Sequence, residues 1–123
     1  MVRGVYTHWD SYLDHNGRIL LNHYDYEKAL KLVELGDISS LASDIGEKHD
    51  FDSCPGGMTN YYGRDRGEDG TGYRDFDNPD DMVSFYDNEY HYYHDGNKWY
   101  VKENSGGWIE LETAINELDE VGE

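Results

Sequence analysis

The sequence predicts a small α+β protein in which an N-terminal strand and a compact unit of short helices precede an antiparallel sheet with a C-terminal β-hairpin and a terminal helix. Apolar residues recur at helical spacing over about residues 16–46 and again from residue 111, whereas residues 2–9 and about 58–109 hold aromatic and β-branched runs. The length of 123 residues leaves room for one domain, so we expect residues 1–123 to form a single unit.

The core is expected to be thin and largely aromatic. Hydrophobic residues make up 37% of the chain and charged residues 30%, a balance that leans toward disorder. However, the chain also holds 12 Tyr, 3 Trp and 3 Phe, and each aromatic ring buries roughly 150–250 Å² when packed. A domain with so thin a core is marginal alone, which leaves room for a homo-oligomer or for stabilisation by a partner.

The first half of the chain is expected to contain one strand and then helices. Residues 2–9 are β-branched and aromatic with partial alternation, which predicts a strand. A short helix is expected over about 18–24. The clearest helix covers about 26–35, where Asp25 is a good N-cap and Gly36 a good C-terminal stop.

A further short helix is expected to complete the helical unit. Asp37 is placed to cap it and Gly46 to end it. The side chains at helical spacing that would face the core are Ile38, Leu41, Ala42 and Ile45.

The second half is expected to be β-rich. Pro55-Gly56-Gly57 is a turn signal, residues 58–62 are a plausible strand, and residues 63–79 read as a long exposed loop. Asn78-Pro79-Asp80-Asp81 is expected to form a further turn.

A hairpin and a helix are expected at the C-terminal end. Residues 83–93 and 98–102 would be its strands, because Asp95-Gly96 between them is a typical hairpin turn. A second turn at 105–107 precedes a short strand at 108–109. The terminal helix is predicted from the helical spacing of four apolar side chains, Leu111, Ala114, Ile115 and Leu118.

Charge is the most unusual property of the sequence. The formal net charge is −17, and most of it lies in the second half: residues 1–60 hold 5 Lys/Arg and 10 Asp/Glu, residues 61–123 hold 5 and 17. So acidic a chain repels phosphate backbones, which argues against direct nucleic-acid binding, and is attracted to basic protein surfaces. The alternative is that the acidity serves solubility or a salt-adapted host.

The compartment is expected to be a reducing cytoplasm. Cys54 is the only cysteine, so no internal disulfide and no Cys-based zinc site can form. Residues 1–20 carry several charges and no apolar run, so neither a signal peptide nor a membrane anchor is expected.

His8 and Asp10 are the only pair that suggests acid–base catalysis. They lie two residues apart at the end of the first expected strand, on one face if that strand continues. No Ser or Cys nucleophile accompanies them in any known pattern, so a histidine that simply bonds a nearby carboxylate is the alternative. The six His residues show no metal-ligand spacing, and we expect neither a metal nor another cofactor.

A Gly-rich loop offers a possible site for an anionic or nucleotide-like ligand. Arg64 and Arg66 could bind phosphate in a bidentate manner, and Tyr61 and Tyr62 could stack on a base. The competing interpretation is that these arginines form internal ion pairs with their acidic neighbours.

Acidic residues after residue 64 could instead form one binding face. Carboxylates arranged on a face can take the place of phosphates and occupy a channel lined with Lys and Arg. A solvated surface without a partner is the alternative. The residues in question are Asp65, Glu68, Asp69, Asp75, Asp77, Asp80, Asp81, Asp87 and Glu89.

Three segments of the sequence resemble a family of small bacteriophage and prophage proteins. They are GVYTHWDSYLDHNGRILLNHY near the N-terminus, LVELGDISSLASDIGEKHDFD and the loop YYGRDRGE, which together cover about residues 4–70. No catalytic residue comes with the resemblance, which implies an accessory gene of a mobile element. Small acidic phage proteins often inhibit host defence.

We therefore expect a non-enzymatic inhibitor that acts in the host cytoplasm. Its acidic face would bind the basic surface of a bacterial defence protein, such as a CRISPR effector nuclease, as a nucleic-acid mimic. The first alternative is a small-molecule sponge that uses the arginine loop, and the second is a small hydrolase that uses His8 and Asp10.

Overall fold

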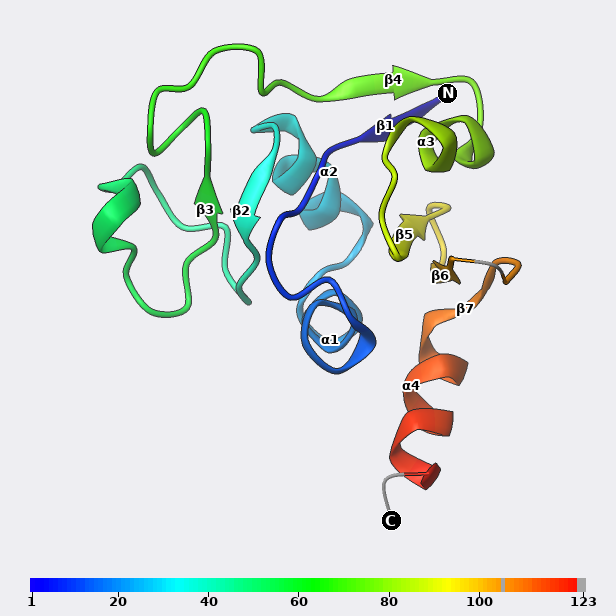
Figure 1. The fold of residues 1–123 in the computed structure, drawn as a ribbon. Coiled ribbons are helices and arrows are strands. Elements are labelled where there is room, and N and C mark those ends of the chain that lie inside the picture. The colour runs from blue at the N-terminus through cyan, green and yellow to red at the C-terminus, as the bar shows by residue number, and fades with distance from the viewer. Residues whose placement is uncertain (105, 122–123) are drawn as a thin grey trace.

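The computed structural model describes residues 1–104 and 106–121 and confirms the mixed α+β class, with an N-terminal strand, a C-terminal hairpin and a terminal helix (Figure 1). A π-helical turn and a 3₁₀ turn, η1 and η2, accompany the helices and strands. In chain order the elements are β1 (Val2–Gly4), η1 (Leu13–Gly17), α1 (Arg18–His23), α2 (Tyr26–Glu34), β2 (Ile38–Ser40), η2 (Phe51–Ser53), β3 (Asn60–Tyr61), β4 (Arg74–Phe76), α3 (Pro79–Phe85), β5 (Tyr90–His94), β6 (Trp99–Glu103), β7 (Ile109–Glu110) and α4 (Leu111–Val121).

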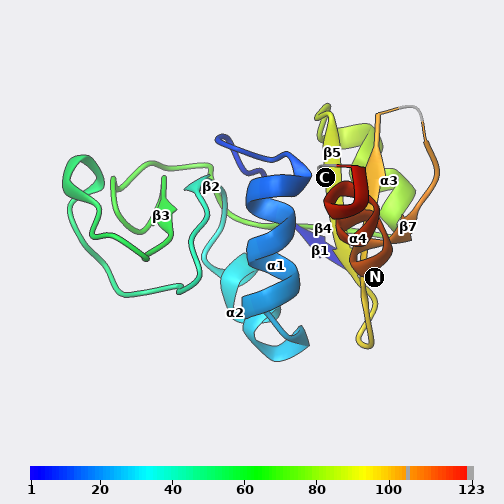
Figure 2. The ribbon, with the colours of Figure 1, turned by 90° about the horizontal axis from the view of Figure 1, so that it is seen from below.

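The strands form small antiparallel sheets that join distant parts of the sequence. The described strands pair as β1–β4, as β2–β3 and as the three-stranded sheet β5–β6–β7. Figure 2 shows α1 in the middle of the molecule, with β2 and β3 on one side and the β5–β6–β7 sheet with α4 on the other. No helix among the described residues is long and apolar enough to cross a membrane.

Helix α2 confirms the strongest helix prediction. The Asp25 carboxylate accepts a hydrogen bond from the backbone N–H of Lys28 at 2.8 Å, which is the N-cap interaction expected from the sequence. Gly36 ends the helix with a φ of 94°, a left-handed conformation that glycine adopts without strain. Ala29 and Leu32 are buried on its inner face.

The predicted short helix over 37–46 is wrong. Ile38–Ser40 is strand β2, and no helix follows it before Gly46. The Asp37 carboxylate accepts from the backbone N–H of Tyr6 at 3.0 Å, and the Ile38 N–H donates to the Tyr6 carbonyl at 2.7 Å. Residues 37 and 38 therefore pair with the N-terminal segment, and this pairing overrides the helical spacing of the apolar residues. The spacing alone could not reveal it.

The predicted turn at Asn78–Asp81 and the predicted long strand over 83–93 are also wrong. The Asn78 side chain accepts from the N–H of Asp81 at 2.9 Å and Pro79 follows at the first helical position, so these residues begin helix α3. Strand β5 therefore starts only at Tyr90. The expected loop of residues 63–79 also contains β4, because residues 74–76 pair with β1.

The predicted hairpin turn, the return strand and the terminal helix are confirmed. Gly96 has a φ of 98°, and the Asp95 carboxylate accepts from the N–H groups of Asn97 and Lys98, both at 2.8 Å. The predicted turn at 105–107 includes Ser105, which lies outside the described residues. Helix α4 buries three of the four predicted residues, Leu111, Ala114 and Ile115.

Aromatic side chains join the C-terminal sheet to the N-terminal half. Their polar atoms donate to backbone carbonyls: Tyr92 Oη to Ser11 at 2.6 Å, and Trp99 Nε1 to Tyr24 at 2.8 Å. The Tyr86 hydroxyl adds a bond to the Gly4 carbonyl at 3.3 Å. The aromatic content expected to build the core thus also supplies its directional contacts.

Candidate functional site

Arg64 and Asp65 form a buried ion pair and not a surface site. The Arg64 side chain is 11% exposed and that of Asp65 0%, and Arg64 Nε lies 2.9 Å from Asp65 Oδ1. Arg64 also donates to the carbonyls of Thr59, Ile45 and Gly46. Its guanidinium is therefore fully engaged inside the protein and does not offer the bidentate anion site expected of it.

The environment of Asp65 keeps it ionised. Burial by itself raises the pKa of Asp65, but the Arg64 guanidinium and the backbone N–H groups of Tyr61 and His49 outweigh burial and hold the pKa below its usual range. Asp65 therefore cannot belong to an exposed acidic face, which corrects the expectation for this residue.

The other residues of the arginine loop do not converge on a ligand site. Tyr61 is completely buried and its hydroxyl donates to the Leu32 carbonyl at 2.6 Å. Arg66 pairs with Glu68 at 2.7 Å on the surface, and its guanidinium lies 4.7 Å from the ring centre of Phe51 and 5.2 Å from that of Tyr62. The competing interpretation of internal ion pairs therefore describes this loop.

The structure does not bring the side chains of His8 and Asp10 together. His8 Nδ1 lies 2.8 Å from the hydroxyl of Tyr6, and no hydrogen bond joins His8 to Asp10 within the described part of the chain. Asp10 has a φ of 59°, so the strand does not continue through it and the shared face expected from the spacing is lost. Across residues 1–104 and 106–121 no group of three or more His, Cys, Asp or Glu side chains could hold a metal ion.

The remaining predicted acidic residues are all exposed, and we call them the acidic edge. They are Glu68, Asp69, Asp75, Asp77, Asp80, Asp81, Asp87 and Glu89. The segment that carries them runs along one border of the molecule through β4 and α3, while α4 extends away at the far end (Figure 1).

Only part of the acidic edge is neutralised by neighbouring groups. Asp75 pairs with Arg3 at 3.1 Å and Glu68 with Arg66, while Asp80 accepts from the indole N–H of Trp108 at 3.2 Å. The other five carboxylates form no ion pair or side-chain hydrogen bond with any described residue. A largely uncompensated negative potential therefore follows this border.

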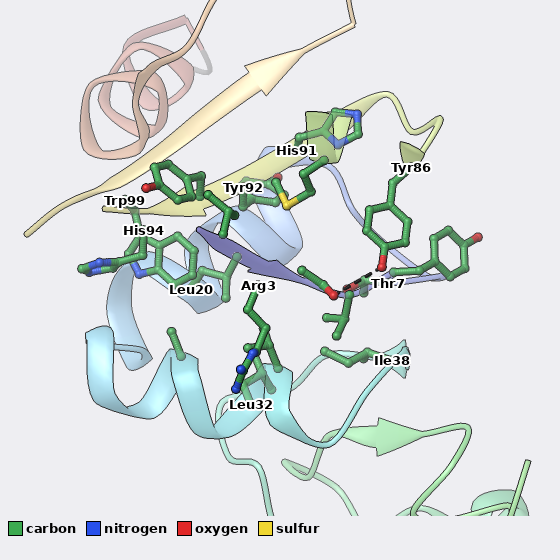
Figure 3. A pocket seen from close by; sticks show the side chains of 18 of the residues that line it. Arg3, Thr7, Leu20, Leu32, Ile38, Tyr86, His91, Tyr92, His94 and Trp99 are labelled. Atoms are coloured by element: carbon green, nitrogen blue, oxygen red, sulfur yellow. Dashed lines mark hydrogen bonds between the residues drawn. The ribbon is translucent and has the colours of Figure 1, made fainter. Parts of the chain in front are cut away.

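A central cleft is the one feature of the site that sequence reasoning missed. It has a volume of about 620 Å³ and lies between α2 and β5, with residues 1–7 along it (Figure 3). This volume is in the range of about 300–1,000 Å³ that is typical of ligand-binding pockets. The sequence signal for this cleft was the dense run of aromatic and histidine residues over 90–99, but the same run is equally typical of a buried core.

The walls of the central cleft are mainly apolar and aromatic. Leu20, Leu32 and Ile38 form the inner wall, and Tyr92 and Trp99 face them from the hairpin (Figure 3). The Tyr92 hydroxyl and the Trp99 indole N–H already donate to backbone carbonyls. These two side chains are therefore structural contacts and not free catalytic groups.

Charged groups lie at the mouth of the cleft. The guanidinium of Arg3 lies there, 3.1 Å from the Asp75 carboxylate and 4.0 Å from the Glu34 carboxylate, so its positive charge is neutralised. Burial lowers the pKa of His91 and His94, which line the β5 side, and both therefore stay neutral near pH 7. The cleft thus has apolar walls inside and carboxylates at its rim.

No family model, no curated protein and no solved structure matches this chain.

Proposed function

We propose that this protein is a non-enzymatic inhibitor that uses its acidic edge to occupy a basic, nucleic-acid-binding surface of another protein. The observation that carries the proposal is the row of exposed carboxylates over residues 68–89, five of which have no partner in the described structure. Such a row can stand in for a phosphate backbone, because each carboxylate carries one negative charge that Lys or Arg side chains can pair with.

Electrostatics favours a protein partner over a nucleic acid. The net charge of −17 repels phosphates at long range and steers the chain toward positive surfaces, which speeds association at low ionic strength. The resemblance to small phage proteins supports a bacterial defence protein as the partner, with a CRISPR effector nuclease as the first to test and the host cytoplasm as the place of action.

The alternatives have less support. Arg64 is engaged by Asp65 and three carbonyls, which disfavours a nucleotide sponge built on that loop. His8 contacts Tyr6 in place of Asp10, which disfavours a hydrolase.

A salt titration against purified CRISPR effector nucleases tests the proposal. The dissociation constant would be measured by calorimetry at about 0.1 M and about 1 M salt, between which the screening length falls from about 10 Å to about 3 Å. We expect binding that weakens steeply with salt and that competes with the nuclease's own nucleic acid. Salt-insensitive binding, or no binding to any nucleic-acid enzyme of the panel, would contradict the proposal.

A further inference from the structure

Strand β5 has an open edge inside the central cleft. In the order β5–β6–β7 it is an outer strand, and the backbone of Tyr90–His94 hydrogen-bonds to no described element except β6. Every residue from Tyr90 to Asp95 lines the cleft. Successive side chains of a strand point to opposite faces of a sheet, so a cleft that touches each of them follows the strand's edge.

The opposite side of the cleft is also extended backbone. Residues 1–7 all line it, and they include β1, whose one strand partner in the described structure is β4. From β6 only Trp99 reaches the cleft, and from β4 only Asp75. The cleft is thus a slot between two strand-like segments, of which β5 presents unpaired N–H and C=O groups to apolar walls. Such groups need hydrogen-bond partners, and an incoming strand supplies them in series.

The rim of the slot indicates which segment fits. Tyr26, Leu30 and Met1 line it with exposed apolar side chains, which are 43%, 36% and 90% exposed. The charged side chains that line it are three carboxylates, those of Glu34, Asp75 and Asp95, and one guanidinium, that of Arg3. Asp75 and Glu34 pair with Arg3, and Asp95 forms no ion pair with any described residue. An apolar slot with an acidic rim is complementary to a chain that carries both apolar and basic side chains.

We propose that the central cleft binds an extended segment of a partner protein, rich in Lys or Arg and β-branched residues, which adds to the open edge of β5 as a further strand. Backbone hydrogen bonds to Tyr90–His94 provide affinity, the apolar walls take alternate side chains, and the carboxylates at the rim select basic ones. This inference goes beyond the acidic edge, with which the cleft shares only Asp75, because it rests on the strand edge and the lining of the cleft.

A synthetic peptide tests this mode of binding directly. The probe is a capped peptide of about seven residues in which Lys and Val alternate, which matches the length of an ordinary strand. Backbone amide shifts in the NMR spectrum of the full chain locate its binding, and calorimetry gives its dissociation constant. We expect the largest shifts in β5 and in residues 1–7, and weaker binding of the same peptide with Glu in place of Lys.

Chemical modification of the peptide backbone provides the most specific control. Methylation of alternate backbone nitrogens keeps the side chains and charges of the peptide but removes its strand-pairing donors. Strand addition predicts at least about a tenfold loss of affinity, or about 1.4 kcal/mol. If the methylated peptide binds equally well, or if the shifts fall only on the acidic edge, strand addition at β5 is wrong. Strand addition at β5 is also wrong if the parent peptide does not bind at about millimolar concentration.

Two leucines, one on α2 and one directly after it, provide a matched pair of variants. Leu30 lines the cleft and is 36% exposed, whereas Leu35 just beyond the helix is 40% exposed and does not line it. Leu30→Lys should weaken peptide binding about tenfold or more, because it replaces an apolar contact by a charge that repels the probe. Leu35→Lys should leave it unchanged, and equal effects of the two variants would overturn the placement of the peptide. These results bear on the cleft alone, whereas the salt titration bears on the acidic edge.

Discussion

Arg64 and Asp65 are neighbours in the sequence, yet their side chains pair with each other inside the protein at 2.9 Å. The pair ties together three segments, because Arg64 donates to carbonyls at Ile45 and Thr59 and Asp65 accepts from the N–H of His49. The loop that looks like an anion site in the sequence is therefore a structural clamp.

Removal of Arg64 should destabilise the fold strongly. Arg64→Ala leaves the fully buried Asp65 carboxylate without its cation, and breaking a buried pair in this way costs about 3–5 kcal/mol. Arg66→Ala is the matched control, since it removes an exposed pair worth about 0–1 kcal/mol. Urea denaturation measures both free energies of unfolding. Equal effects of the two variants would show that the Arg64 pair is not a clamp.

Two glycines with left-handed backbones should differ in their tolerance of alanine. At Gly36 an added Cβ would lie 2.3 Å from the Thr71 carbonyl oxygen, whereas at Gly67 nothing lies within 4 Å. Gly67→Ala should cost about 1–2 kcal/mol, the price of the left-handed conformation alone. Gly36→Ala should cost about 3 kcal/mol or more, because the backbone must also move. Similar melting temperatures for the two variants would contradict the close packing of Gly36 against the Thr71 carbonyl.

The hydroxyl of Tyr92 should hold the hairpin to the N-terminal half. Tyr92→Phe removes its donor to the Ser11 carbonyl and leaves a part-buried acceptor unsatisfied, which costs about 1–3 kcal/mol. Tyr73→Phe is the control. Tyr73 is 40% exposed, its hydroxyl has no bonded partner among the described residues, and its contact with Arg3 involves the ring. Thermal unfolding measures the stability of both variants. If the melting temperature of the Tyr92→Phe variant equals that of the wild type, this hydrogen bond does not hold the hairpin to the N-terminal half.

His91 should make stability depend on pH. Burial lowers its pKa and the charge of Lys102 lowers it further, and both outweigh the hydrogen bond to the Asn88 backbone and the charge of Asp87, which raise it. As the pH falls below the ordinary histidine pKa of about 6.5, the unfolded chain takes up a proton at this position that the folded protein resists, so stability is lost. His91→Gln should therefore reduce the loss of stability between about pH 7 and about pH 5. Identical pH profiles of the two proteins would contradict this.

Local signals in the sequence predicted most of the elements that are stabilised locally, although the cap at Asn78 that begins α3 was read as a turn. The caps at Asp25 and Gly36, the turn at Asp95-Gly96 and the apolar spacing from Leu111 all act within a few residues, and the structure confirms each. Residue 38 shows the opposite case, because its strand pairs with segments far away in the chain. Helical spacing at 37–46 could not reveal that pairing.

The same distinction between local and long-range contacts applies to the candidate site. That an acidic segment follows residue 66 was visible in composition, and the exposure of eight of its carboxylates could be expected from their charge. Asp65 could not be separated from them, since its burial depends on backbone donors at His49 and Tyr61. The central cleft joins residues 1–7 to residues 90–95, and no local pattern places these side by side.

The acidic edge is tested most directly by charge neutralisation with a matched control far from it. One variant combines Asp77→Asn, Asp81→Asn and Asp87→Asn; the other combines Glu112→Gln, Glu117→Gln and Glu120→Gln on α4, at the far end of the molecule (Figure 1). Each removes the same charge from the chain.

The measurement is the dissociation constant of both variants for the effector nuclease bound by the wild type. A contact at the acidic edge predicts that the first variant binds about tenfold or more weakly, or about 1.4 kcal/mol, while the α4 variant stays close to wild type. Equal weakening would show that only net charge matters, and no weakening of the first variant would show that the acidic edge is not the contact.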